Sequence, residues 1–139
     1  MTQENKELLL KDLCGRLPYG VKVKLGDNPN IFDLEYRIKF AVMYGDSDKL
    51  EDILDITNIK PYLFPLSSMT EEQREELYKI GWYLDEDKIY TCFRNYDDAN
   101  YKTHTDCLEL INWCYENHLD INGLITRDLA IDATDKNIY

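Results

Sequence analysis

The segment from Lys60 to Tyr78, KPYLFPLSSMTEEQREELY, constrains the fold more than any other part of the chain. Apolar residues tend to alternate before it and to recur every three or four residues after it. Pro61 and Pro65 hold the backbone extended or tightly turned, because each fixes its own φ angle and pushes the preceding residue out of the α region. The sequence therefore predicts an α+β fold with a β-rich first half, up to about residue 66, and a helical second half, from about residue 70.

A helix is predicted to begin at the end of this segment. Thr70 and Gln73 have the spacing of a capping box, in which each side chain hydrogen-bonds to the backbone N–H of the other residue. Glu71 and Glu72 stand in the first turn, where the helix dipole stabilises negative charge. We predict a helix from Glu71 to Leu84.

Alternation of apolar and polar residues predicts strands before this segment. Tyr19–Leu25 and Ile31–Met43 each place apolar side chains on one face and charged ones on the other, as antiparallel strands with one wet face do. The residues from 48 to 57 fit either a short helix or a strand, and a short third strand near Asp52–Thr57 is preferred. The predicted sheet is antiparallel, with about three to five strands.

A period of three to four residues predicts a helix at the start of the chain and another near its end. The first is Thr2–Arg16, which Thr2 caps and which Pro18 cannot continue. The second is Thr105–Asn117, and the segment Lys88–Arg94 before it fits a strand or a loop. The expected core face of the second helix consists of Leu108, Ile111, Cys114 and Tyr115.

The length and charge of the chain limit what it can do. A chain of 139 residues is typically one domain, so we predict a single domain, 1–139, with an N-terminal helix, the small sheet, and C-terminal helices packed on one face. The net charge of −11 argues against general nucleic-acid binding, which needs clustered Lys and Arg. The acidic charge fits solubility, a basic partner or mimicry of a polyanion.

The sequence also bears on location. The N-terminus, MTQENKELLL, lacks the basic region and apolar run of a signal peptide, and no apolar stretch approaches the roughly 20 residues of a membrane span. The four cysteines, at positions 14, 92, 107 and 114, form no C-x-x-C motif. We therefore expect a cytoplasmic protein with reduced thiols and no membrane partner.

The usual catalytic and metal-binding patterns do not fit the sequence. An EF-hand loop that began at Asp46 would have Glu51 and Thr57 where glycine and glutamate are needed. Cys107 and Cys114 would lie roughly 10 Å apart along a helix, too far to share a zinc ion. The sequence contains no G-x-S-x-G, Walker loop or G-x-G-x-x-G motif. We predict a non-catalytic protein with no cofactor and no metal.

A tyrosine-rich loop is the first candidate for a binding surface. It lies between two predicted elements, where scaffolds commonly present functional side chains. Tyr and Arg are enriched at interface hot spots, and acidic residues suit a basic partner. The candidate partner-binding residues are Tyr90, Phe93, Arg94, Tyr96, Asp97, Asp98 and Tyr101.

A small basic cluster supports an alternative function, the binding of a small anionic ligand. Anionic ligands need clustered Lys and Arg, and these residues are otherwise dispersed in this chain. The alternative ligand-binding residues are Lys22, Lys24, Arg37 and Lys39, which the predicted strands would place together on the wet face of the sheet. A pocket lined by all four would favour this alternative.

Three stretches resemble a known family. They are Lys6–Val23 (KELLLKDLCGRLPYGVKV), Ile59–Gln73 (IKPYLFPLSSMTEEQ) and Ile111–Ala133 (INWCYENHLDINGLITRDLAIDA). In the same order they are similar to a family of small uncharacterised proteins encoded by phages and prophages of gut Bacteroidales. Members usually end in a segment like GLALEAP, from which Leu129–Ala133 departs. The resemblance implies an accessory role in a bacterial cytoplasm and transfers no functional residue.

Together these features predict a non-catalytic phage or prophage accessory protein that acts by protein–protein interaction, with a host or phage protein as partner. A counter-defence protein that sequesters a nucleotide signal is the alternative. An acidic polyanion mimic is a weaker one.

Overall fold

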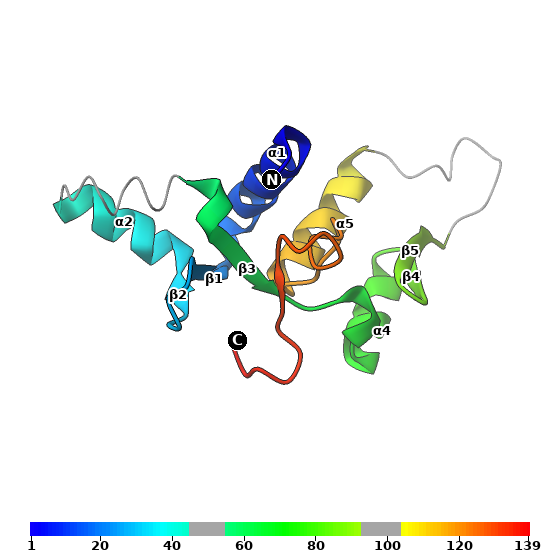
Figure 1. The fold of residues 1–139 in the computed structure, drawn as a ribbon. Coiled ribbons are helices and arrows are strands. Elements are labelled where there is room, and N and C mark those ends of the chain that lie inside the picture. The colour runs from blue at the N-terminus through cyan, green and yellow to red at the C-terminus, as the bar shows by residue number, and fades with distance from the viewer. Residues whose placement is uncertain (45–54, 93–103) are drawn as a thin grey trace.

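The computed structural model describes residues 1–44, 55–92 and 104–139, and its elements confirm the α+β class (Figure 1). Short 3-10 turns at Leu17–Tyr19, Ile56–Asn58 and Leu66–Ser68 connect some of these elements. The helices are α1 (Gln3–Arg16), α2 (Leu34–Tyr44), α4 (Glu71–Lys79) and α5 (His104–Glu116). The strands are β1 (Lys22–Leu25), β2 (Phe32–Asp33), β3 (Ile59–Leu63), β4 (Trp82–Asp85), β5 (Lys88–Thr91) and β6 (Ile131–Asp132).

The strands of the described residues form two sheets. The larger has the order β2-β1-β3-β6, and the smaller is the β4–β5 hairpin. β1 runs antiparallel to both β2 and β3, but β6 runs parallel to β3. The sheet is therefore mixed: the predicted antiparallel pairing holds for β1 with β2 and β3 but not for β3 with β6. Between β3 and β6 the chain passes through α4, the hairpin and α5, and a crossover of this kind allows a strand to return parallel to its neighbour.

The first hydrophobic cluster lies between α1, the larger sheet and the C-terminal segment. Leu9 and Leu13 of α1 pack with Val23 of β1 and Leu63 of β3, and Leu124 closes the cluster from the other end of the chain. All five side chains are buried. The alternation predicted for β1 is correct here, because Val21 and Val23 lie in this cluster while Lys22 and Lys24 do not.

A buried polar network joins α1 to the chain that follows α5. The Arg16 guanidinium donates to both oxygens of Asp12, at 2.6 and 3.0 Å, and to the Leu119 carbonyl oxygen at 2.8 Å. The Asn122 side-chain amide donates to Asp12 at 2.8 Å. Gly15 lets α1 pack closely against Tyr115 of α5, because a Cβ atom at position 15 would collide with the Tyr115 ring.

The second hydrophobic cluster lies between α4, the hairpin and α5. Its buried members include Leu77 from α4 and Cys114 from α5. Trp82, Leu84 and Ile89 of the hairpin pack against it. Burial raises the pKa of the Cys114 thiol to about 12, so this cysteine acts as a small apolar residue.

The helix caps predicted at Thr2 and Thr70 are present. The Thr2 hydroxyl accepts from the Asn5 N–H at 3.2 Å and caps α1. Thr70 and Gln73 form the complete capping box of α4, with bonds of 3.1 and 3.0 Å. The caps could be predicted from the sequence because each one involves only residues within one helical turn of each other.

The long strand predicted at Ile31–Met43 is wrong. Only Phe32–Asp33 is strand, and α2 follows directly. Asp33 initiates the helix by accepting the Tyr36 N–H at 3.1 Å, and Lys39 bridges to Glu35 at 2.7 Å, one turn away. The alternating apolar pattern is thus outweighed by an N-cap and an i,i+4 ion pair.

Three further predicted boundaries change. The helix predicted to reach Leu84 ends at Lys79, because Gly81 takes a φ of +92° and lets the chain turn into β4. Lys88–Thr91 is a strand, while the rest of Lys88–Arg94 reaches past the described residues. Of the strand predicted near Asp52–Thr57, residues 52–54 lie outside the described residues and Ile56 begins a 3-10 turn.

The division into a β-rich half and a helical half also fails. In addition to the predicted first helix, α2 lies in the first half, and β4, β5 and β6 lie in the second. The strand β3 overlaps the start of the Lys60–Tyr78 segment, and Ile59–Leu63 pairs with β1 on one side and β6 on the other. Pro61 is tolerated there because β3 begins to pair with β6 only at Tyr62.

Candidate functional site

The β4–β5 hairpin carries the first of the predicted contact residues. Tyr90 lies directly opposite Tyr83, and their rings stack with centroids 5.6 Å apart. Because side chains alternate along a strand, this pair faces away from Leu84 and Ile89, which pack on the second cluster. The hairpin therefore presents an aromatic pair, and Tyr90 is 39% exposed.

The other predicted contact residues, Phe93, Arg94, Tyr96, Asp97, Asp98 and Tyr101, lie outside the described residues. The described chain stops at Cys92, next to β5, and resumes at His104, where α5 begins. The prediction for these six residues stays a prediction.

A groove of about 600 Å³ lies along α5 at the edge of the second cluster, since Ile80 and Trp113 line the groove and also pack against that cluster. It is lined by Ile80, Leu108, Glu109, Asn112, Trp113 and Glu116. Leu108 was expected in the core but is 45% exposed, because Leu110, Cys114 and Tyr115 occupy the buried positions. The apolar stripe of α5 is wider than the core requires, and this width was the sequence signal that could have revealed the groove.

The groove has acidic walls, and side-chain hydrogen bonds join α5 to α4 beside it. Glu109 and Glu116 line it, and the described lining contains no basic residue. The Trp113 indole N–H donates to Glu76 at 3.2 Å, which ties α5 to α4. The Gln73 side chain donates to Asn117 at 3.3 Å and makes a second link between the same helices. The arrangement suits a segment that carries both an apolar and a basic group.

The four residues of the basic alternative do not form one cluster. Lys22 pairs with Asp33 at 3.3 Å, and Lys39 pairs with Glu35 at 2.7 Å. The Tyr36 N–H, more than Lys22, lowers the pKa of Asp33, and Glu35 raises the pKa of Lys39. The prediction that the four share the wet face of a sheet is wrong, because Arg37 and Lys39 belong to α2.

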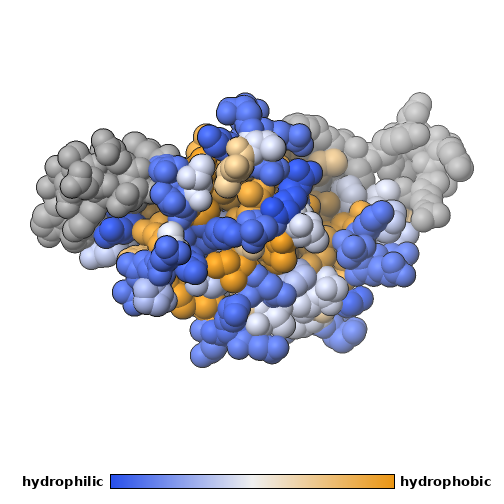
Figure 2. Space-filling model, in the orientation of Figure 1, coloured by the Kyte–Doolittle hydropathy of each residue, from blue (hydrophilic) through white to orange (hydrophobic). Residues whose placement is uncertain are grey.

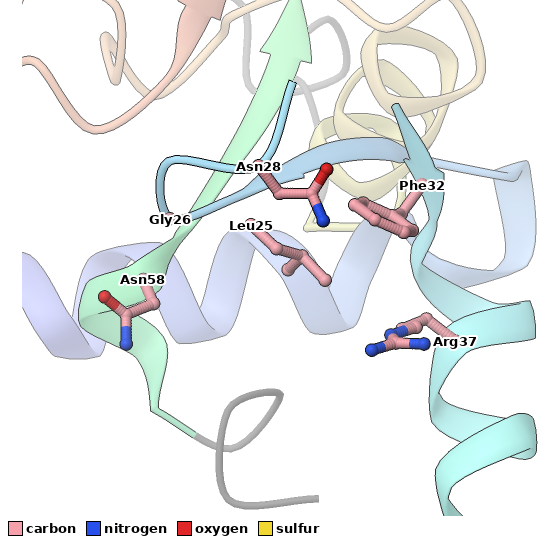
Figure 3. A pocket seen from close by; sticks show the side chains of 6 residues that line it. All are labelled: Leu25, Gly26, Asn28, Phe32, Arg37 and Asn58. Carbon is pink, nitrogen blue, oxygen red and sulfur yellow. The ribbon is translucent and has the colours of Figure 1, made fainter. Parts of the chain in front are cut away.

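Arg37 lines a hollow of about 280 Å³ beneath the turn that joins β1 to β2 (Figure 3). Its guanidinium carbon lies 5.4 Å from the centre of the Phe32 ring, within the range of a cation–π contact. Leu25 forms an apolar wall, and the amides of Asn28 and Asn58 stand at the rim (Figure 3). Of the four basic residues, only Arg37 lines this hollow.

Lys24 lines a neighbouring hollow of about 470 Å³. The Gly26 N–H donates to the Asn58 carbonyl at 2.8 Å, and both residues line both hollows. Lys60 lies directly opposite Lys24 in the β1–β3 pair, and its ammonium is 2.8 Å from the exposed Asp128. With Asp27 also in the lining, the positive charge is largely balanced.

His118 and Tyr139 form a contact that the sequence did not suggest. Their rings stack 3.6 Å apart, although 21 positions separate them. No spacing rule connects two such residues, so no sequence signal could have identified the pair.

In the part of the chain that the structure describes, no three His, Cys, Asp or Glu side chains could share a metal ion, and no helix is both long and apolar enough to cross a bilayer.

Figure 2 shows that apolar residues reach the surface over the central sheet in this view, with hydrophilic residues around them. No protein-family model matches the chain, and comparisons with curated proteins and with solved structures gave no match. Function must therefore be argued from the geometry of the grooves and hollows themselves.

Proposed function

We propose that the protein acts by binding another protein, and that the α5 groove with the adjoining β4–β5 hairpin is its contact surface. The observation that carries the proposal is the exposure of Leu108 beside Trp113 in a groove with acidic walls. Trp is one of the residue types most enriched among interface hot spots, and Trp113 lines this groove.

The charge of the groove indicates the chemistry of the partner. Glu109 and Glu116 lie beside the apolar residues, and the whole chain has a net charge of −11. A partner segment with an apolar side chain flanked by Lys or Arg would bury its apolar group on Leu108 and place its charge near the glutamates. Such complementarity raises the association rate and excludes acidic competitors.

The resemblance to small phage and prophage proteins gives this activity a setting. In that setting the chain is a non-catalytic accessory protein in a bacterial cytoplasm, and its partner is a host or phage protein. The aromatic pair Tyr83–Tyr90 supports a contact role for the hairpin, and the other predicted contact residues follow Tyr90 in the sequence.

Paired substitutions test the contact surface. Leu108→Lys introduces a like charge for a basic partner and removes the apolar anchor. Leu10→Lys is the matched control, because Leu10 is 55% exposed on α1. In affinity capture from host lysate, Leu108→Lys should lose a partner that both wild type and Leu10→Lys retain. Equal capture by all three proteins, with unchanged melting curves, would show that the groove is not the contact surface.

The hollow at Arg37 supports a second candidate function, the binding of a small anionic ligand. Phe32 and Leu25 offer an apolar wall, and Arg37 offers a planar cation. A panel of cyclic mono- and dinucleotides, assayed by thermal shift, tests this candidate. A ligand that raises the melting temperature of wild type but not of Arg37→Ala would favour it, and no shift with any nucleotide would count against it.

A further inference from the structure

The pairing between β1 and β3 contains a gap that a side chain fills. Val23 pairs with Pro61, and Leu25 pairs with Ile59. In this register the next residues, Lys22 and Tyr62, come opposite each other. The Lys22 N–H donates to the Tyr139 hydroxyl oxygen at 3.0 Å, and that hydroxyl donates to the Tyr62 carbonyl oxygen at 2.8 Å.

The chemistry of this gap is therefore defined by its occupant. One strand offers a donor and the other an acceptor, so the bridging group must accept and donate at the same time. A hydroxyl does both. Burial raises the pKa of Tyr139 to about 12, so the phenol keeps the proton that it donates.

Two rings complete the site around the hydroxyl. The His118 imidazole lies 3.6 Å from the Tyr139 ring and nearly parallel to it, at 11°. The Phe64 ring is tilted by 53° with its centre 6.0 Å away. Burial lowers the pKa of His118 to about 4, so the imidazole is neutral near pH 7 and stacks as a flat aromatic ring.

His118 is held in place by the end of α5. The Leu119 N–H bonds to the Cys114 carbonyl at 2.9 Å, and the His118 N–H bonds to the Tyr115 carbonyl at 3.1 Å. These two bonds form a Schellman motif in which His118, with a φ of +57°, takes the position that glycine usually fills. The wall of the site is thus part of the helix terminus and does not depend on Tyr139.

The segment that carries Tyr139 is attached to the body mainly at its tip. Ala133 bonds to Leu63 at 2.8 Å, and the next four residues are exposed. Asp135 and Asn137 have φ angles of +63° and +52°, which non-glycine residues rarely adopt. In the described part of the chain, the hydrogen bonds from this segment to β1 and β3 beyond Ala133 are those of the Tyr139 hydroxyl.

We propose that the gap between β1 and β3, walled by His118 and Phe64, is a binding site for phenols, and that Tyr139 is its tethered and exchangeable occupant. The site selects a flat ring with a hydroxyl that donates and accepts. Phenylalanine lacks the hydroxyl, and an aryl ether can accept from Lys22 but cannot donate to Tyr62. This site is separate from the α5 groove and does not depend on the function proposed for it.

Emptying the site and refilling it with a free phenol tests the proposal. In Tyr139→Ala, 4-methylphenol at millimolar concentration should raise the melting temperature and shift the amide NMR signal of Lys22. Toluene, which lacks the hydroxyl, and 4-methylanisole, which lacks the donor, should bind at least tenfold more weakly. A folded Tyr139→Ala protein that responds equally to all three compounds, or to none, would overturn the proposal.

Tyr139→Phe keeps the ring and the tether, and it provides the test if the alanine variant does not fold. The Lys22 amide should exchange with solvent at least tenfold faster in this variant, and 4-methylphenol should restore its protection. An unrestored amide would overturn the proposal.

In wild type, the tether supplies an effective concentration in the millimolar range, so tens of millimolar 4-methylphenol should compete with it. The ring signals of Tyr139 should then move toward the values of an unstructured tyrosine. Signals that stay unchanged at saturating phenol would overturn the claim that the occupant exchanges.

Discussion

The two hydrophobic clusters are held together in different ways. The first joins residues far apart in the sequence, and a buried polar network adds links of similar length: Asn122 binds Asp12, 110 positions away, and Arg16 binds the carbonyl of Leu119, a member of the second cluster, 103 positions away. The second is built from α4, the hairpin and α5, which form one stretch of the chain with a gap in its described residues. The first cluster should therefore control global unfolding, while the second can open locally and change its surface.

Among the substitutions that test this difference between the clusters, Arg16→Ala should reduce the stability of the protein most. Arg16 and Asp12 are both completely buried, and removal of the guanidinium leaves a buried carboxylate without its ion pair. The expected loss is about 3–5 kcal/mol in the free energy of unfolding, measured by urea titration.

Arg127→Ala is the matched control for this change. Arg127 pairs with Glu4 at 3.6 Å on the surface, so its loss should cost no more than about 1 kcal/mol. A similar small loss for both variants would mean that the buried network does not hold the first cluster together.

The same contrast explains how much of the structure was predictable. The capping box at Thr70 and the cap at Thr2 depend on residues a few positions apart and were predicted correctly, and β1 lies within the predicted strand Tyr19–Leu25, although Tyr19 itself ends a 3-10 turn. The parallel pairing of Tyr62 with Ile131 depends on the path of the intervening chain, so local patterns could not reveal it. At α2 two local signals competed, and the Asp33 cap outweighed the alternating pattern.

The candidate sites were less predictable than the fold. Tyr90 was identified from composition and does reach the surface. Leu108 was assigned to the core because a periodic pattern shows which residues share a helix face but not how far the core extends around it. The Tyr139 site joins β1, β3, the end of α5 and the C-terminal segment, and no single stretch of sequence contains it.

The next largest effects come from one truncation in each cluster. Leu63 and Leu77 are both completely buried, and each change to alanine removes the same volume. Leu63→Ala should lose about 2–5 kcal/mol in global unfolding. Leu77→Ala should lose less globally and should mainly speed amide exchange in β4 and β5, because a two-stranded hairpin is marginal without its support. Equal global losses and uniform exchange would indicate a single cooperative unit.

Acid should lower the stability of the folded protein through protonation of His118. Its pKa is about 4 in the folded protein, because of burial and then of the nearby positive charges of Arg16 and Lys22, against about 6.5 when unfolded. The unfolded state binds the proton first, so this contribution is complete above pH 6.5 and is lost as the pH falls toward 4. The loss is at most about 3 kcal/mol, and less because the ring is partly exposed.

His118→Gln measures this contribution directly. Urea titrations of wild type and variant at pH 7.0, 5.5 and 4.5 should show a shallower loss of stability with acid in the variant. Parallel pH profiles would exclude His118 as the group that titrates.

The smallest expected effect compares the two helix caps. The Thr70 cap of α4 is a complete box, in which Gln73 bonds back to the Thr70 N–H, while Thr2 makes a single side-chain bond at the start of α1. Thr70→Ala should cost about 1 kcal/mol, and Thr2→Ala should cost about half as much, because its helix end can fray into solvent. Thr70→Ser, which keeps the hydroxyl, should retain most of the stability.

If the second cluster opens locally, the Thr70→Ala loss should appear mainly as faster amide exchange within α4, with little change in the urea midpoint of the first cluster. A loss shared equally by both clusters would show instead that α4 and α1 unfold together, and that the groove on α5 belongs to the same rigid body as the sheet.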